Sequence, residues 1–422
     1  MKIAVIGSKG LPPHQGGIEH QCAELYPRMV AAGHQVDLYA RSSYNDDARV
    51  RSYKGVNIIT VPSIRARGID ALACSGMSAV LASGRAYDIA HFHALGPSLF
   101  TPLPKALSGA KVLTTCHGLD WQRAKWGKFS SQVIKTGERA AVRFADRLVV
   151  VSEALQDYFF QTYGKKSIYI ENAPVAYADS DDGFSYGQAL GLERQRYLVF
   201  LGRLVPEKRV DLLLEAFQRL QQKSHSKGWK LTLIGDKSDT HQFSSRLLHL
   251  ANNSPNIIFT GELQGRYLAE VVRGAGLFVL PSDLEGLPLA LLEAMQEGIP
   301  AVVSDLPVHR QMLGTDRGLT FKTGNLVDLQ ERLAWAIAHM PQMERMAQQA
   351  KDYVRSHHNW DSITHKYLGV YNSMLNRDQP LVPSPVSEQP TRKRQPQETS
   401  FPANNRLSTT RTAARTIYNR HS

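Results

Sequence analysis

The stretch Leu277–Glu293, with the sequence LFVLPSDLEGLPLALLE, decides how this chain is expected to fold. Its first four residues form an apolar run that is typical of a buried strand, and a helical pattern begins near Leu287 after a polar turn. The N–H groups that are free in such a strand–turn–helix unit suit an oxygen-rich ligand. Gly286 allows the backbone to approach a ligand closely, and Pro288 is compatible with the first helical turn because it lacks an N–H.

Two carboxylates lie in this stretch. Glu285 stands in the turn, and Glu293 follows about two helical turns later, so each can contact one end of a ligand that lies along the helix start. A polyhydroxylated molecule suits two acceptors in this arrangement. Taken alone, the stretch is equally compatible with a loop charge and a solvated helix charge, so the assignment depends on the rest of the chain.

Length and composition predict a soluble protein with two domains. The 422 residues are too many for one ordinary core, and the contents of 42% hydrophobic and 21% charged residues are typical of globular proteins. No apolar run is long enough to cross a membrane, and the run at residues 3–6 is too short for a signal peptide, so a cytoplasmic protein is expected. Cys22, Cys74 and Cys116 are widely spaced and indicate neither a disulfide framework nor a zinc ribbon.

The formal net charge of +12 favours anionic partners. Residues 377–422 contain eight basic and three acidic residues, so more than half of the surplus lies on the part that is expected to fold. Residues 121–147 mix Trp and Phe with Lys and Arg, which suits a helix on an acidic membrane surface or an ordinary solvated helix. No nucleic-acid motif accompanies the charge, so a nucleic-acid partner is not expected.

Two series of alternating strand and helix patterns predict two parallel sheets, each covered by helices on both faces. Residues 176–194, between the two series, are rich in Asp, Ser, Gly and Ala and are interpreted as a linker. The expected strands lie at 3–6, 36–40, 56–61, 89–92, 112–115, 148–151, 168–170, 197–201, 231–234, 257–260, 277–280, 301–303 and 319–321. The expected parts are a Rossmann-like domain at 1–190, a second one at 195–358, a helix that returns to the first domain at 359–376, and a disordered basic tail at 377–422.

The first expected strand-to-helix turn ends in Gly16 and Gly17. It matches neither a G-x-G-x-x-G fingerprint nor a Walker A loop, and no acidic residue follows the strand at 36–40, so a dinucleotide is not expected. The N–H groups of the turn can still face an anion, although a turn that merely requires glycine explains the sequence as well.

Three histidines follow expected strands, namely His91, His93 and His117. A zinc site can be drawn from them, but histidines at strand ends more often line a ligand site as hydrogen-bonding groups. Cys116 precedes His117 directly, so the two side chains should face opposite ways and do not suggest a nucleophile pair. The D-x-D sequence Asp179–Asp181 lies in the expected linker, where acidic residues are ordinarily solvated, so no metal site is expected.

In the second series, Arg203 and Lys208 flank the turn that follows the strand at 197–201. Ligands of α/β sheets bind at this edge, so two cations here suit a diphosphate. A surface salt bridge to Glu207 explains the cations equally well.

Taken together, these features resemble the retaining glycosyltransferases of the GT-B fold, in particular family 4, over about residues 2–372. Four motifs recur in order: GGIE at 16–19, HG at 117–118, GRLVPEK at 202–208 and EGLPLALLE at 285–293. The resemblance implies an α/β protein with two Rossmann-like domains that face each other across a cleft. The N-terminal domain would bind the acceptor and the C-terminal domain the sugar nucleotide.

The resemblance also implies roles for single residues. Arg203 and Lys208 would bind the diphosphate of a sugar nucleotide, and Gly16 and Gly17 would approach it from the other domain. His117 would contact the sugar near the reacting centre.

The remaining contacts to the sugar nucleotide would come from residues 277–293. Glu293 would accept hydrogen bonds from the ribose hydroxyls, and Glu285, with the backbone around Gly286 and Leu287, would hold the donor sugar.

The expected activity is a retaining, metal-independent hexosyl transfer that uses a nucleoside-diphosphate sugar as substrate and no cofactor. The groups expected to act on the reacting atoms are His117, Glu285, Arg203 and Lys208. The expected acceptor is a lipid-linked or polysaccharide intermediate, with possible contact to the inner face of the membrane. Two alternatives belong to other classes: a catalytically silent sugar-nucleotide-binding or scaffold protein, and an adaptor that acts through the basic tail.

Overall fold

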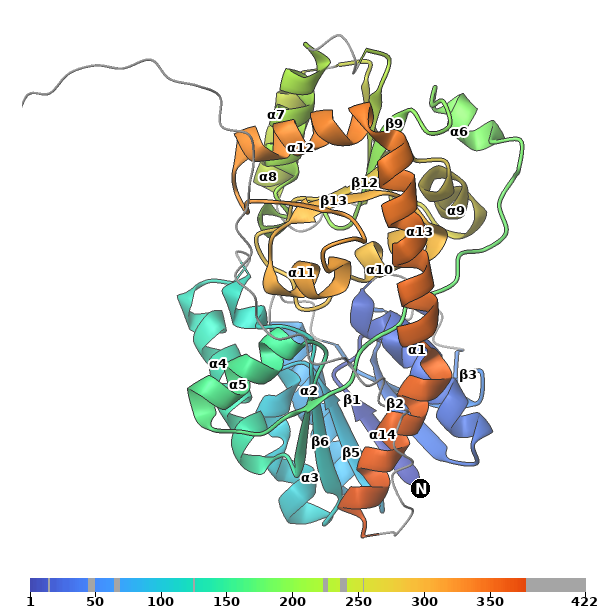
Figure 1. The fold of residues 1–422 in the computed structure, drawn as a ribbon. Helices are drawn as coiled ribbons and strands as arrows, with labels where there is room; N and C mark the ends of the chain where they lie inside the picture. Colours follow the sequence, from blue (N-terminus) through green and yellow to red (C-terminus); the bar gives the residue numbers. More distant parts are fainter. Residues whose placement is uncertain are drawn as a thin grey trace, which may run out of the picture. The chain divides into compact units, whose positions relative to one another are not determined.

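The computed structural model describes residues 1–13, 16–44, 50–63, 69–123, 126–222, 227–235, 241–252 and 254–376. They form two sheets, each with helices on both faces (Figure 1). Residues 377–422, expected to be a disordered tail, lie outside the described residues.

The first sheet has eight strands in the order β3-β4-β2-β1-β5-β6-β7-β8. All neighbours are parallel except β3, which pairs antiparallel with β4 and was not expected, since two residues give no pattern. The strands are β1 (Lys2–Ile6), β2 (Gln35–Arg41), β3 (Ser52–Tyr53), β4 (Val56–Val61), β5 (Ile89–His93), β6 (Lys111–Cys116), β7 (Arg147–Val150) and β8 (Ile168–Tyr169).

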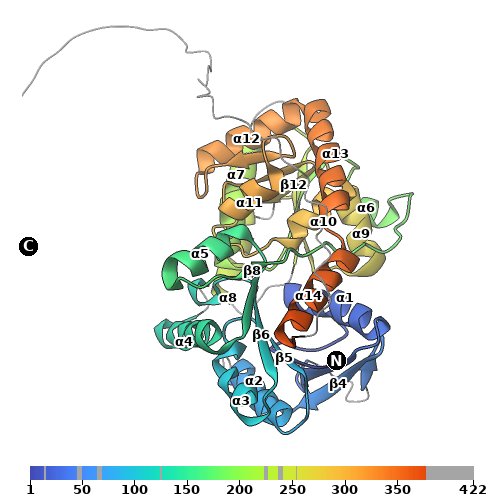
Figure 2. The same ribbon diagram turned by 60° about the horizontal axis from the view of Figure 1, so that its bottom comes forward.

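Both faces of this sheet are covered, which is why its strands are continuous apolar runs. On one face, Ile3 and Val5 pack against helices α1 and α14. Ala4 and Ile6 point to the other face, toward α2. Both ribbon views show α14 running beside α1, as the predicted return of the chain requires (Figure 2). The helices are α1 (Gly17–Ala31), α2 (Ile69–Ser83), α3 (Pro102–Leu107), α4 (Lys128–Phe144), α5 (Glu153–Tyr163) and α14 (Trp360–Met374), with the short η1 (Pro97–Phe100) and η2 (Asp120–Gln122).

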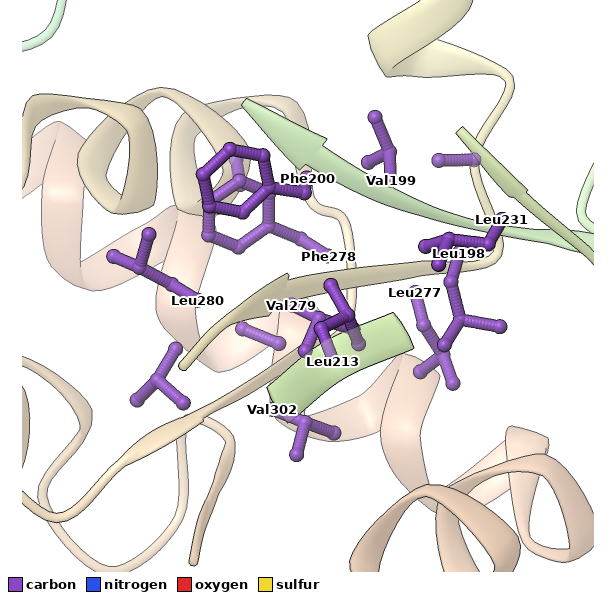
Figure 3. Close-up of a cluster of buried hydrophobic side chains, with 14 of the residues drawn as sticks. Leu198, Val199, Phe200, Leu213, Leu231, Leu277, Phe278, Val279, Leu280 and Val302 are labelled. Carbon is purple, nitrogen blue, oxygen red and sulfur yellow. The ribbon is translucent and has the colours of Figure 1, made fainter. Parts of the chain in front are cut away.

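The second sheet has six parallel strands in the order β11-β10-β9-β12-β13-β14. Its central strands β9 and β12 are fully or nearly fully buried, and Figure 3 shows Phe200 of β9 and Phe278 of β12 within this core. The strands are β9 (Tyr197–Leu201), β10 (Lys230–Ile234), β11 (Ile257–Gly261), β12 (Leu277–Leu280), β13 (Ala301–Ser304) and β14 (Leu319–Phe321). The helices are η3 (Pro206–Lys208), α7 (Val210–Gln221), α8 (His241–Ala251), α9 (Gly265–Arg273), α10 (Leu289–Glu297), α11 (Pro307–Leu313), α12 (Leu326–Ala338) and α13 (Met340–His357).

The expected linker at 176–194 is shorter than the sequence suggested. Phe184 is buried in the core of the second sheet, and the short helix α6 (Ser185–Ala189) follows it. The Gly187 N–H donates to Glu270 Oε1 at 2.9 Å, which ties this segment to α9. Asp181 of the D-x-D sequence accepts hydrogen bonds from the N–H groups of Gly183 and Ser185, so its carboxylate caps a turn.

Candidate functional site

The residues predicted to bind the donor lie at the carboxyl ends of strands. The strand order changes direction between β1 and β5 in the first sheet and between β9 and β12 in the second. Open α/β sheets bind ligands outside the carboxyl ends at such a point. The glycine turn follows β1, the GRLVPEK segment follows β9, and the EGLP segment follows β12, so both sheets place the motifs where a ligand is expected.

Lys208 and Glu285 form an ion pair in the second domain. Lys208 Nζ lies 2.6 Å from Glu285 Oε1, and Ser282 Oγ donates to the same oxygen at 2.7 Å. Burial alone would raise the pKa of Glu285, but Lys208 and the nearby His309 outweigh burial and lower it. Glu285 is therefore a carboxylate at neutral pH, and the salt bridge of Lys208 to Glu207, one interpretation of the sequence, does not form.

His309 supports this pair from the first turn of α11. It is fully buried, its Nδ1–H donates to the Ser304 carbonyl at 2.8 Å, and Ser304 Oγ donates to the Ser282 carbonyl at 2.6 Å. Burial lowers the pKa of His309. No sequence pattern indicates this role of His309, because its proximity to Glu285 depends on the loop that follows β13.

Arg203 has a different environment. No hydrogen bond or ion pair of its guanidinium occurs within the part of the chain that the structure describes. Its pKa is lowered first by burial and then by Arg123, a cation of the N-terminal domain. Arg123 pairs with Asp120 at 2.9 Å. Glu207, Asp120 and Glu285 act on Arg203 in the opposite direction but form no ion pair with it among the described residues, so its guanidinium is available to an anionic ligand.

Glu293 lies on α10 and is held by the segment that joins the two domains. Tyr177 Oη donates to Glu293 Oε2 at 2.9 Å. Burial raises the pKa of Glu293 to about 7, although the Tyr177 hydrogen bond acts in the opposite direction. This carboxyl group is therefore partly protonated at neutral pH, as is common in ligand sites.

Glycines allow the two domains to approach each other closely. A Cβ atom at Gly286 would overlap the His117 carbonyl group, so a side chain cannot be accommodated there. A Cβ atom at Gly17 would lie 3.1 Å from Leu289 of α10. Leu287 packs against both the second core and the cluster around α4 and α5. The predicted glycine positions therefore meet at the contact between the domains.

Gly16 has a different function in the structure. It precedes α1 with a φ of 105°, a value that favours glycine, and the Glu19 carboxylate folds back over it. Glu19 is 4% exposed and accepts a hydrogen bond from the Lys9 N–H at 2.9 Å. The glycine turn is thus closed on one side by a carboxylate of its own helix.

His91 and His93 lie on the same face of β5, as their two-residue spacing predicted, and His117, which follows β6, lies beside His93. His93 Nδ1 lies 3.0 Å from His117 Nε2, and the remaining nitrogens of His91 and His93 are bonded to hydroxyl groups. Among the described residues no group of three or more His, Cys, Asp or Glu side chains is arranged to hold a metal ion. Burial lowers the pKa of His117 to about 3, with Arg123 acting in the same direction. Cys116 is fully buried, and burial raises the pKa of its thiol.

Helix α4 contains most of the aromatic and basic segment. Glu138 is almost fully buried and accepts hydrogen bonds from Trp121 Nε1 and Tyr158 Oη at 2.9 Å each and from Tyr163 Oη at 2.5 Å. Phe129, at the start of the helix, is 83% exposed. The segment therefore combines a packed inner side with one exposed aromatic residue. In the described residues, no helix has the length and apolar character that a membrane span requires.

Sequence reasoning missed four residues of this region: Arg123, Tyr177, Glu138 and His309. Arg123 and Glu138 belong to a segment whose charges were considered only as a surface property. The others contact the site through loops or the interdomain segment, for which periodicity gives no signal.

Sequence comparison identifies two family models that match successive parts of the chain. The model of the glycosyl transferases group 1 matches residues 186–353, and that of glycosyltransferase family 4 matches residues 15–173. A glycosyltransferase of Methanocaldococcus jannaschii is 22% identical over 392 residues, 88% of this chain and 98% of the relative. A GDP-mannose-dependent alpha-mannosyltransferase of Mycobacterium tuberculosis is 24% identical over 390 residues, 89% of this chain and 98% of the relative.

Solved structures show the same fold. Sucrose-phosphate synthase from Thermosynechococcus elongatus superposes with a TM-score of 0.76 at 18% identity, over 89% of this chain and 100% of that one. A protein of Anabaena in complex with UDP and glucose gives a TM-score of 0.73 at 16% identity, over 88% of this chain and 100% of that one. The two-domain arrangement is therefore the GT-B fold.

Proposed function

Since the chain belongs to the family 4 glycosyltransferases with the GT-B fold, we propose that it moves a hexose from a nucleoside-diphosphate sugar to a hydroxyl group, with retention at the anomeric carbon. The acceptor in this proposal is a lipid-linked or polysaccharide intermediate. The single observation that carries the proposal is Arg203, a half-buried cation that forms no hydrogen bond or ion pair through its guanidinium among the described residues and is repelled by Arg123.

The charges suit the expected course of the reaction. When the bond between the sugar and the phosphate breaks, negative charge builds up on the diphosphate, and preorganised cations stabilise it. Arg203 and Arg123 supply such charge from two domains, and Lys208 adds a third cation that is oriented by Glu285. The proposal needs no metal ion, because fixed cations neutralise the leaving group.

The remaining roles follow from the position of each group. The Gly286 backbone lies against the His117 backbone at the contact between the domains, and Glu285 and Leu287 flank it in sequence, so we assign the donor sugar to this place. Glu293 is assigned to the ribose hydroxyls. Gly17, next to Leu289, lets the turn after β1 approach the diphosphate, and Gly16 shapes that turn.

A membrane-associated acceptor is supported by the surface of the N-terminal domain. The net charge of the chain is +12, and Phe129 is exposed at the start of the basic helix α4. An exposed aromatic residue beside basic residues suits binding to the interface of an anionic bilayer. We therefore place the enzyme at the inner face of the membrane as a peripheral protein.

The proposal is tested by turnover of sugar nucleotides without acceptor. UDP-glucose, GDP-mannose and ADP-glucose form the panel, because the Anabaena structure holds UDP and glucose and the M. tuberculosis relative is named for GDP-mannose. We expect slow release of one nucleoside diphosphate, lowered on the order of 10²–10³-fold by Arg203→Ala. Arg219→Ala, a change at an exposed position of α7, should leave the rate unchanged.

Two further arms separate the alternatives. Chelator and Asp181→Ala should leave turnover intact, because Asp181 caps a turn; loss under both would assign a metal to the reaction. Binding of a sugar nucleotide without turnover, even with acceptor glycans added, would contradict enzymatic function and favour a scaffold protein. Activity that depended on residues 377–422 alone would favour an adaptor.

A further inference from the structure

A chain of hydrogen bonds leads from His117 into the core of the N-terminal domain. His117 Nε2 lies 3.0 Å from His93 Nδ1, and His93 Nε2 lies 2.6 Å from Tyr26 Oη on α1. Tyr26 Oη lies 2.8 Å from His91 Nδ1. These four side chains come from α1, from β5 and from the turn that follows β6.

The chain continues to helix α14, which returns from the second domain. His91 Nε2 lies 2.8 Å from Thr115 Oγ1, and Thr115 Oγ1 lies 3.3 Å from Tyr367 Oη. The Gln21 amide Nε2 donates to Tyr367 Oη at 3.1 Å. Every member except His117 is completely buried, namely Gln21, Tyr26, His91, His93, Thr115 and Tyr367.

The three histidines of this hydrogen-bond chain are neutral, so each of their rings carries one proton. Burial lowers the pKa of His91 and His93 well below the usual range and lowers that of His117 to about 3. Burial also raises the pKa values of Tyr26 and Tyr367. Each imidazole therefore has one N–H and one bare nitrogen, and each tyrosine keeps its proton.

At the buried end, Gln21 determines which group donates and which accepts in each hydrogen bond of the series. In the amide orientation of the structure, its nitrogen faces Tyr367 and can only donate. Tyr367 accepts this hydrogen bond and gives its own proton to Thr115 Oγ1. Thr115 then donates to its other partner, His91 Nε2, so the proton of His91 must be on Nδ1.

The same reasoning extends to the site. His91 Nδ1–H donates to Tyr26 Oη, and Tyr371 Oη lies 2.7 Å from the same nitrogen as a side branch. Tyr26 therefore donates to His93 Nε2, which leaves the proton of His93 on Nδ1. That proton is donated to His117 Nε2. The one proton of neutral His117 is consequently on Nδ1, which makes no hydrogen bond with any residue that the structure describes.

We propose that Tyr26 and His93 are positioning residues that hold His117 as the tautomer with its proton on Nδ1, so that the ring presents an N–H donor to an oxygen of the reactants. The identity of the reactants rests on the proposed function, whereas the tautomer is a property of the free protein. A hydrogen bond made by the second nitrogen of a histidine is a general means of fixing which nitrogen carries the proton. Because the hydrogen-bond series ends at buried residues, the position of the proton on His117 does not depend on solvent.

The direct test is the tautomer of His117 in the full-length protein. Histidine labelled with ¹⁵N distinguishes protonated from bare ring nitrogens, and the spectrum of His117→Gln assigns the signals of His117. We expect protonated Nδ1 and bare Nε2 in the wild-type protein without substrate. Protonated Nε2 would overturn the proposal, whatever the outcome of the turnover assay.

Two variants of the same buried cluster sharpen this test. Tyr26→Phe removes the donor to His93, so the proton of His117 should move at least partly to Nε2. Tyr371→Phe removes a hydroxyl group from the side branch. The proton of His117 should stay on Nδ1 in this variant, because His91 still donates to Tyr26. An unchanged tautomer in folded Tyr26→Phe would contradict the proposal.

Kinetics show whether the tautomer matters for the reaction. With the donor that the panel identifies, Tyr26→Phe should lower kcat about tenfold and leave the KM of the donor unchanged, since an interaction that directs one hydrogen bond in the transition state is lost. Tyr39→Phe removes an equally buried hydroxyl group, which contacts Tyr87 in the same domain, and should leave kcat unchanged. An equal fall of kcat in both variants would indicate a structural effect and overturn the positioning role.

Discussion

Replacing Glu293 by glutamine should stabilise the protein above neutral pH. The pKa of this carboxyl group is raised to about 7 in the folded protein, first by burial, from an ordinary value of 4.5. Between these two values the folded state keeps a proton that the unfolded state releases. The free energy of unfolding therefore falls as the pH rises through this window, and the loss is complete above about pH 7.

The size of the effect follows from the pKa difference. One pKa unit corresponds to about 1.4 kcal/mol, so the difference between 4.5 and about 7 corresponds to at most about 3.5 kcal/mol. The side chain is partly exposed, which makes this an upper limit. Below about pH 4.5 both states are protonated, and the Glu293→Gln variant should be no more stable than the wild-type protein.

The assay is the difference in thermal midpoint between Glu293→Gln and the wild-type protein at pH values from 4 to 8. For a domain of this size, about 3.5 kcal/mol corresponds to about 7–14 °C as an upper limit. Glu344→Gln, at an exposed position of α13, serves as the control for a change of surface charge. A difference between Glu293→Gln and the wild-type protein that stays constant over this range would refute the reasoning.

Tyr177→Phe extends the same test. Tyr177 Oη donates to Glu293 Oε2, and this hydrogen bond opposes the effect of burial on the pKa. Its removal should raise the pKa of Glu293 further and shift the loss of stability to higher pH. If Glu293 also binds the ribose, as proposed, Glu293→Gln should gain stability and lose affinity for the sugar nucleotide.

Three other predictions concern the framework of the site. Gly286→Ala should lower turnover at least about tenfold, because its Cβ would overlap the backbone of the other domain, whereas Gly127→Ala, with open space at its Cβ, should be neutral. Glu138→Gln should lower the free energy of unfolding by about 2 kcal/mol, because the three side chains that donate to Glu138 lose a charged acceptor. Chemical denaturation of the variant and the wild-type protein measures this difference. Arg203→Ala and Lys208→Ala should both reduce turnover, but Lys208→Ala should lower the thermal midpoint more than Arg203→Ala.

The strands could be predicted from the sequence because both faces of each sheet are covered by helices. Every strand expected from an apolar run is present, with ends that differ by at most one residue. The unexpected strand β3 has two residues at a sheet edge, one exposed and one half-buried, and such a strand produces no apolar run. Residues around Phe184 were interpreted as linker because they are polar in composition, yet one aromatic residue is enough to anchor them in the second core.

Which parts of the chain meet at the site could be predicted only where the order of the strands determines it. Parallel strands place their carboxyl ends at one edge, so the turns after β9 and β12 had to be neighbours. Which side chains pair there depends on loop conformations that no periodicity reports, as the Lys208–Glu285 pair shows. Contacts such as that of His91 with Tyr371 join residues 280 positions apart, and they depend on how α14 packs on the first sheet.

The two cations of the GRLVPEK segment are consequently not equivalent. Lys208 neutralises a buried carboxylate at 2.6 Å, so removing Lys208 leaves Glu285 without its partner and destabilises the fold. Arg203 forms no ion pair among the described residues; Arg123 repels it, and Glu207, Asp120 and Glu285 attract it only at longer range, so its removal should cost less stability than that of Lys208. A phosphate oxygen that approaches Lys208 competes with Glu285 for the ammonium group, whereas no carboxylate among the described residues forms an ion pair with Arg203. The free energy of binding an anion should therefore come mainly from Arg203, with Lys208 acting to orient Glu285.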